Sequence, residues 1–273
     1  MRKLLIAVIA VAMTVAGFSV LASADEGPQN TEWTFSFSAK KKNKPAASNS
    51  LILPAKVDDQ GTEDTSDDVY TPPEKSTIRF PKGSSVDTRA LARCKLDASD
   101  VGRGEECPNR TKLGNGEAVS IVGGTPVGNS GQRRGGSPVN ATIEAFNQKN
   151  KILFIVQPCG GGTGPTTGEP CAPAGSPIVL QGKWSKIATR PKLVVPTPPG
   201  LLDIGIVIVR FQLTTDKHTK TRRVKIDGER RRVVVSFATT PNRCRGQWKS
   251  FAIENYVDDS KLKIPDSQTC RKG

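Results

Sequence analysis

Residues 221–236 of the chain read TRRVKIDGERRRVVVS. Two runs rich in β-branched residues flank the dipeptide Asp227-Gly228. A type I′ turn needs positive φ at both central residues, and Asp and Gly meet that need better than most residues do. We therefore predict a β-hairpin with a two-residue turn, in which Ile226 lies opposite Glu229.

The predicted hairpin carries an excess of positive charge. Its register would place Lys225 opposite Arg230 and Arg223 opposite Arg232, with both pairs on one face. Like charges that face each other destabilise a sheet, and a bound polyanion would relieve their repulsion and release counterions. The alternative is a solvated hairpin whose charges prevent edge-to-edge aggregation. The predicted anion-binding residues are Lys220, Arg222, Arg223, Lys225, Arg230, Arg231 and Arg232.

The formal net charge of +14 is unevenly distributed along the chain. Residues 25–136 contain 16 basic and 16 acidic side chains, whereas residues 137–273 contain 22 basic and 10 acidic ones. This asymmetry favours an anionic partner, such as a cell-envelope polymer, an acidic polysaccharide or anionic lipid headgroups. We do not expect nucleic acid, because few aromatic residues lie among the basic ones to stack on bases.

Alternation of apolar and polar residues predicts strands along most of the chain. Trp33, Phe35 and Phe37 alternate with polar residues and would share one face of a strand. No segment shows helical periodicity over three turns, and 26 Gly and 20 Pro disfavour long helices. We predict an all-β, antiparallel β-sandwich or jelly roll with long loops. Further strands are predicted at 77–80, 118–122, 139–146, 152–157, 178–182, 204–213, 221–226, 230–238 and 248–257.

The domain organisation is predicted to be simple. Residues 33–273 would form a single domain, preceded by a disordered tail at 25–32. Polar or Gly-rich composition predicts loops at 40–50, 58–68 and 123–136, and another between Cys159 and Cys171.

Residues 1–24 have the layout of a secretory signal. Arg2 and Lys3 precede an apolar run, and Ala22-Ser23-Ala24 matches the small-residue pattern of a cleavage site. The alternative is an uncleaved membrane anchor, because the apolar run approaches the spanning length. We expect cleavage, and therefore an exported protein without a transmembrane span, secreted or held at the cell-envelope surface.

Six cysteines follow the predicted signal, an even number that indicates disulfides in an exported protein. They allow 15 connectivities. The nearest-neighbour set closes the shortest loops, and we expect that set: Cys94 with Cys107, Cys159 with Cys171, and Cys244 with Cys270. A metal site is not expected, because no C-x-x-C motif occurs and the chain has a single histidine.

Few residues are candidates for catalysis. His218 has Asp216 nearby, but the surrounding cations oppose an imidazolium, so we expect a solvated histidine. The acidic run Asp58–Asp68 lacks the spacing of an EF-hand loop, so we expect an acidic surface loop. The Gly-rich segment before Cys171 lacks the Lys-Ser or Lys-Thr of a phosphate-binding loop. We predict no catalytic residue and no cofactor.

A second group of residues carries a resemblance to known proteins. The pattern consists of Cys94, Cys107-Pro108, Lys112-x-Gly114-x-Gly116-x-Ala118, Phe146-Asn147, Leu180-x-Gly182, Val195-Pro196 and Cys244-x-x-x-Trp248. It resembles a group of exported, cysteine-paired, β-rich actinobacterial proteins of unknown function. The resemblance covers most of 77–257 and implies secretion, β architecture and paired cysteines, but no site residue. From the residues themselves, Gly114 and Gly116 indicate a bulge or a close backbone approach.

The sequence thus favours an exported, non-enzymatic, envelope-associated protein that binds an anionic polymer through a basic face. One alternative is a carbohydrate-binding module or glycoside hydrolase, which would need exposed Trp or Tyr in a cleft. Trp33 and Trp248 are expected in the core, whereas Trp184 lies between lysines and could be exposed. A third possibility is a structural or protein-interaction domain.

Overall fold

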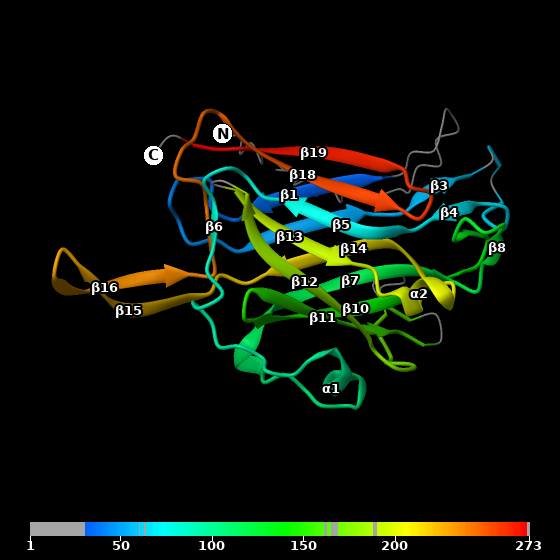
Figure 1. Cartoon of the computed structure of the whole chain (residues 1–273), viewed down its shortest axis with the longest axis horizontal. Helices are drawn as coiled ribbons and strands as arrows, with labels where there is room; N and C mark the ends of the chain where they lie inside the picture. Colours follow the sequence, from blue (N-terminus) through cyan, green and yellow to red (C-terminus); the bar gives the residue numbers. More distant parts are fainter. Residues whose placement is uncertain are drawn as a thin grey trace, which may run out of the picture.

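The computed structural model describes residues 31–59, 61–62, 64–160, 163–164, 169–187 and 190–271. The predicted signal at 1–24 and the tail up to residue 30 lie outside this part. The described chain is all-β and antiparallel, as predicted (Figure 1). Its main sheet has eleven described strands, in the spatial order β1 (Glu32–Phe37), β2 (Ser48–Leu53), β14 (Val207–Thr215), β7 (Lys112–Val122), β10 (Ser137–Gln148), β11 (Lys151–Pro158), β12 (Ile178–Ile187), β13 (Arg190–Pro196), β5 (Pro73–Arg79), β18 (Gln247–Tyr256) and β19 (Lys261–Thr269).

This sheet curls until its two edge strands, β1 and β19, lie side by side. Side chains of β19 bridge the junction: the Phe35 amide donates to Asp266 Oδ2 at 2.8 Å, and the Phe37 amide donates to Gln268 Oε1 at 2.9 Å. Gln268 Nε2 donates in return to the Phe37 carbonyl at 2.7 Å. Pro265 of β19 has no N–H to donate, which suits a strand at a sheet edge. One continuous sheet therefore supplies both facing walls of the core.

The core lies inside the curled sheet. Trp33, Phe35 and Phe37 all point inward from β1 and are 4% exposed, which confirms the predicted alternation. Trp248 is equally buried on β18, also as predicted. Trp33 stacks on Phe35, whereas Phe37 packs edge to face against Phe35, with centroids 4.9 Å apart, and against Trp248.

Close backbone contact at β7 explains two glycines. A Cβ atom on Gly114 would lie 2.0 Å from the Thr214 carbonyl oxygen, and one on Gly116 would lie 2.0 Å from that of Gln212. Both oxygens belong to the neighbouring strand β14. The close approach inferred from the glycines is thus confirmed.

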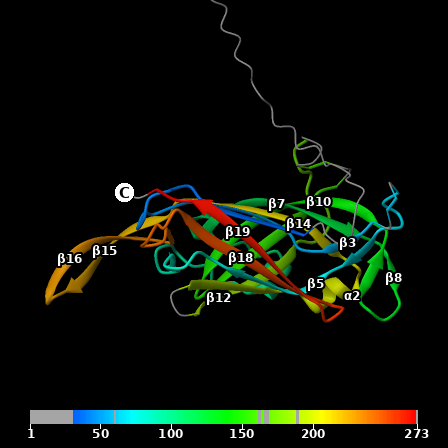
Figure 2. The same cartoon turned by 90° about the horizontal axis from the view of Figure 1, so that it is seen from above.

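Smaller elements surround the main sheet. The described part has two short α-helices and one 3₁₀ turn, α1 (Ala98–Gly102), α2 (Pro199–Asp203) and η1 (Asn109–Thr111). A four-stranded sheet is formed by β3 (Lys56–Asp58), β4 (Val69–Thr71), β9 (Gln132–Arg134) and β8 (Thr125–Val127). Two pairs complete the fold, β6 (Ser85–Val86) with β17 (Ala238–Thr239), and β15 (Thr219–Ile226) with β16 (Glu229–Ser236). The β15–β16 pair projects from one end of the body (Figures 1 and 2).

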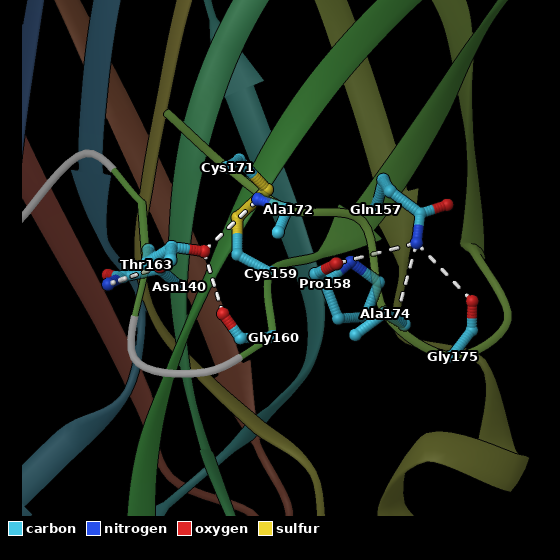
Figure 3. The surroundings of a disulfide bond; sticks show 10 residues. All are labelled: Asn140, Gln157, Pro158, Cys159, Gly160, Thr163, Cys171, Ala172, Ala174 and Gly175. Carbon is cyan, nitrogen blue, oxygen red and sulfur yellow. Dashed lines mark hydrogen bonds between the residues drawn. A yellow bond between two sulfur atoms is a disulfide. The ribbon is translucent and has the colours of Figure 1, made fainter. Parts of the chain in front are cut away.

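All three predicted disulfides are present: Cys94–Cys107, Cys159–Cys171 and Cys244–Cys270. Figure 3 shows the hydrogen bonds among residues next to the Cys159–Cys171 disulfide. Thr163 Oγ1 donates to the Gly160 carbonyl at 2.7 Å and accepts from the Ala172 amide at 3.1 Å. Three disulfides fit a protein that folds in an oxidising environment.

Three strands of the main sheet went unpredicted: β2, β13 and β19. The predicted loop at 40–50 overlaps the start of β2, and the predicted loop at 123–136 contains β8 and β9. Proline explains two of these failures, because Pro191 and Pro196 in β13 and Pro265 in β19 argue against strands in sequence reasoning. Strand β1 begins at Glu32, so this residue belongs to the sheet and not to the predicted tail.

Candidate anion-binding site

The predicted hairpin has the predicted register. Asp227 and Gly228 form its turn with φ of 50° and 88°, and Ile226 lies opposite Glu229. Lys225 lies opposite Arg230, and Arg223 lies opposite Arg232.

The seven predicted anion-binding residues divide between the two faces of this hairpin. Arg223, Lys225, Arg230 and Arg232 share one face, which we call the hairpin basic face. All four are exposed, and none forms an ion pair with any described residue. Four unpaired cations in one exposed array give a positive potential that an anion can use.

The opposite face carries Lys220, Arg222 and Arg231. Two of these three side chains already have partners in the protein. Arg231 Nη2 lies 3.0 Å from Glu229 Oε2. Arg222 Nη2 donates to the Arg89 carbonyl at 2.6 Å and anchors the hairpin to the body. The structure therefore does not bring all seven residues to one surface.

A second cationic surface lies on the outside of the main sheet. Ile78, Leu193 and Ala252 are buried and point inward from β5, β13 and β18, so their neighbours in sequence point outward. Across β12, β13, β5, β18 and β19, eight outward positions hold cations, and Glu74, beside the bulge at the start of β5, is the single exposed carboxylate of these described strands. We call this set the outer basic face: Lys75, Arg79, Lys183, Arg190, Lys192, Lys249, Lys261 and Lys263.

The centre of the outer basic face is an aromatic ring. Arg79 Cζ, Arg190 Cζ and Lys263 Nζ lie 5.4, 5.0 and 4.6 Å from the centroid of Phe251, within the range of cation–π attraction. Burial, with the positive charge of Arg79 beside it, lowers the pKa of Arg190. Nε of Arg79 is buried and has no hydrogen-bond partner among the described residues. Three mutually repelling cations held on one ring would gain from an added anion.

Sequence reasoning missed the outer basic face, although a signal for it exists. Arg190-Pro191-Lys192 and Lys261-Leu262-Lys263 both place cations two residues apart, the spacing of one strand face. Pro191 and Pro265 argue against strands in these segments, so the pattern did not lead to a strand prediction. The pairing of β5 with β13 and β18, which are distant in sequence, then gathers the separate motifs on one surface.

His218 differs from its predicted state. It is half-buried rather than solvated, and its Nε2 lies 3.0 Å from the Leu113 carbonyl oxygen. This contact fixes the base of the hairpin against β7. His218 thus has a structural partner.

The acidic run is only partly an exposed loop. Asp68 is buried and accepts a hydrogen bond from the Tyr70 hydroxyl at 3.1 Å. Burial raises the pKa of Asp68, and burial together with Asp68 raises the pKa of Tyr70 to about 12. Asp59 and Asp64 accept hydrogen bonds from backbone amides two residues later and so stabilise turns. Within the described residues, no three His, Cys, Asp or Glu side chains group closely enough to hold a metal ion.

The aromatic residues do not form the exposed platform that the carbohydrate-binding alternative needs. Tyr70 and Tyr256 are buried. Trp184, for which the sequence left exposure open, is half-buried and packs 5.4 Å from Phe80 and 6.2 Å from Phe237 between ring centroids. Its indole lies against the core because β12 turns position 184 inward, whereas Lys183 points to the opposite face of the sheet.

No family model, curated protein or solved structure matches this chain. None of the described helices is long and apolar enough to span a lipid bilayer. What the fold and the site define is a disulfide-linked, all-β protein with two carboxylate-poor cationic surfaces.

Proposed function

We propose that this protein is exported and binds an anionic polymer of the cell envelope through the outer basic face, without catalysing a reaction. The observation that carries the proposal is the set of eight cations on five adjacent strands, against one exposed carboxylate, Glu74, on those described strands. Mutual repulsion makes such a surface unfavourable unless an anion compensates it.

The geometry favours a polymer over a small anion. Neighbouring strands are about 4.8 Å apart, and alternate residues on one strand are about 6.7 Å apart. The cations therefore form a two-dimensional array that one small anion cannot cover. An acidic polysaccharide or a polyol phosphate, which repeats its charge along the chain, would contact several of them at once.

Single-stranded nucleic acid fits this surface less well than a saccharide or phosphate polymer does. Binding of unpaired bases relies on several aromatic rings that stack with them. Phe251 is the single aromatic residue at the outward positions of the five described strands, and three cations already surround it.

The hairpin basic face would act as a second contact for the same polymer. It projects from one end of the molecule (Figure 2), which would extend the reach of the protein along a chain. The competing explanation is protection of the two free hairpin edges against aggregation. The two explanations differ in one respect, because only the first makes polymer affinity depend on these four residues.

Retention on immobilised dextran sulfate, measured against salt concentration, tests the proposal. We expect strong retention at low ionic strength and steady loss of it as salt rises. The triple variant Arg190→Gln, Lys192→Gln, Lys263→Gln should lower affinity about tenfold or more, and should reduce the slope of log affinity against log salt by roughly 2. Its substitutions lie at outward positions, so the fold should survive.

A matched variant separates a specific surface from net charge. Lys95→Gln, Arg103→Gln, Arg110→Gln also removes three cations, which are exposed and lie in the segment around α1. We expect less than a threefold loss of affinity. Equal losses in the two triple variants, or retention that is insensitive to salt, would refute the proposal. The variant Arg223→Gln, Arg230→Gln, Arg232→Gln then reports whether the hairpin contributes.

A further inference from the structure

The curled sheet encloses an apolar cavity of about 140 Å³. Its walls come from both halves of the sheet and include Trp33, Phe80, Phe154, Leu180, Trp184 and Leu213. Protein interiors are packed as densely as organic crystals and hold few voids larger than a water molecule. An apolar space of this size stays dry and can take an apolar guest.

The volume of the cavity limits how large a ligand it can hold. A cavity of about 150 Å³ lined by Leu, Ile and Phe side chains holds benzene, a molecule of six carbons. The present cavity therefore has room for roughly six carbon atoms. Its aromatic lining includes the pairs Phe80–Trp184 and Phe154–Phe211, each with centroids 5.4 Å apart, so its walls are largely rigid rings.

The cavity adjoins a cationic cleft. Val86 and Trp184 line both the cavity and a second depression of about 480 Å³. Four cations and one carboxylate border this depression: Arg89, Arg93, Lys149, Lys186 and Asp87.

The charges in the cleft leave a net positive site. Arg89 Nε lies 2.9 Å from Asp87 Oδ1, so the carboxylate is already paired. Burial alone would raise the pKa of Asp87, but hydrogen bonds from Arg89 and the charges of Arg89 and Arg222 hold it below its usual range. Lys149 and Lys186 are exposed and form no ion pair with a described residue.

Trp184, which lies between the cavity and the cleft, has a hydrogen-bond donor without an acceptor in the described part of the chain. Nε1 of Trp184 is buried and has no hydrogen-bond partner among the described residues. A buried N–H without an acceptor is rare in folded proteins. A carboxylate held at this boundary would supply an acceptor.

We propose that the cavity and the cleft form one binding site for a medium-chain aliphatic carboxylate. About six carbons of the chain would lie among the aromatic residues of the cavity, and the carboxylate would lie beside Trp184 among the cations of the cleft. The ligand class follows from an apolar space that adjoins a cluster of positive charges. This site is distinct from the outer basic face, and the inference does not depend on polymer binding.

Fluorescence quenching with 8-bromooctanoate tests the inference on the purified protein. Bromine quenches tryptophan at contact, and Trp33 and Trp184 both line the cavity. We expect saturable quenching that octanoate reverses by competition and that acetate does not. Quenching that fails to saturate, or that octanoate cannot reverse, would overturn the proposal.

Two variants locate the two ends of the ligand. Val195→Phe places a larger side chain in the cavity wall and should reduce binding at least tenfold while circular dichroism stays unchanged. Lys149→Gln, Lys186→Gln should weaken octanoate about fivefold and leave octanol unaffected. Equal losses for octanoate and octanol would overturn the role of the cleft. If Val195→Phe does not fold, Leu180→Phe repeats the test at another point of the wall.

Discussion

Glu254 is a buried carboxyl, and its replacement by Gln should change how stability depends on pH. The residue lies on β18, points inward and is 0% exposed. Its Oε2 accepts a hydrogen bond from Ser76 Oγ at 2.6 Å, while Oε1 has no partner among the described residues. Burial raises the pKa of Glu254 from 4.5 to about 8, against the opposing effect of the Ser76 hydrogen bond.

The raised pKa fixes the sign and size of the effect. Below pH 4.5 the carboxyl is protonated in both the folded and the unfolded state, so it adds no pH dependence. Between pH 4.5 and 8 the folded state keeps a proton that the unfolded state releases, so the free energy of unfolding falls as pH rises. One pKa unit corresponds to 1.36 kcal/mol, so the full loss reaches about 5 kcal/mol at pH 8 and stays constant above it.

Urea denaturation between pH 4.5 and 8.5 measures this loss. Glu254→Gln keeps the shape and the acceptor for Ser76 but removes the titration. We expect the variant to match the wild type near pH 4.5 and to be several kcal/mol more stable at pH 8.5. Glu74→Gln, at an exposed position of β5, is the matched control and should follow the wild type at every pH.

One result would refute this reasoning. If wild type and Glu254→Gln show parallel stability curves from pH 4.5 to 8.5, the carboxyl is not kept protonated by burial in the folded state. Tyr256, the next inward residue on β18, does not confuse the measurement, because burial raises the pKa of its hydroxyl too, which takes its titration further from this range.

Two further predictions concern how the sheet closes and packs. Replacing both Asp266 and Gln268 by Ala removes three hydrogen bonds between β1 and β19 and should cost about 2–4 kcal/mol with faster amide exchange at Phe35 and Phe37, whereas Ser267→Ala between them should be neutral. Gly116→Ala would place a methyl group 2.0 Å from a carbonyl oxygen of β14 and should cost about 2–3 kcal/mol or more in urea denaturation. A Cβ on Gly200 would meet nothing within 4 Å, so Gly200→Ala should not destabilise, and equal losses for the two glycines would contradict the packing argument.

Local patterns were enough to predict much of this fold. Asp227-Gly228 between β-branched runs indicates a hairpin because few other dipeptides accept two positive φ angles, and the register follows from the two-residue turn. Trp33, Phe35 and Phe37 indicate the core face of β1 because a strand alternates its faces. Nearest-neighbour cysteines paired as expected. In each case the information lies within a few residues of the feature.

Features that depend on distant pairing could not be predicted in this way. The closure of β1 on β19 joins residues more than 200 positions apart through side chains, and no local pattern indicates it. The outer basic face likewise needs β5 to lie between β13 and β18. Its cations are scattered in sequence, and the prolines of β13 and β19 conceal the strands that carry half of them.

Three strands, β5, β12 and β13, contribute to both of the surfaces to which we assign binding. Leu180, Leu193 and Ile78 point inward and line the cavity, while Lys192 and Arg79 alternate with them and point outward. Because side chains alternate with a period of two, a shift of one residue in the pairing of β5 with β13 would expose the apolar set and bury the cations. Burying several unpaired charges is prohibitive, so the cations on the outside help to specify the register that forms the cavity on the inside.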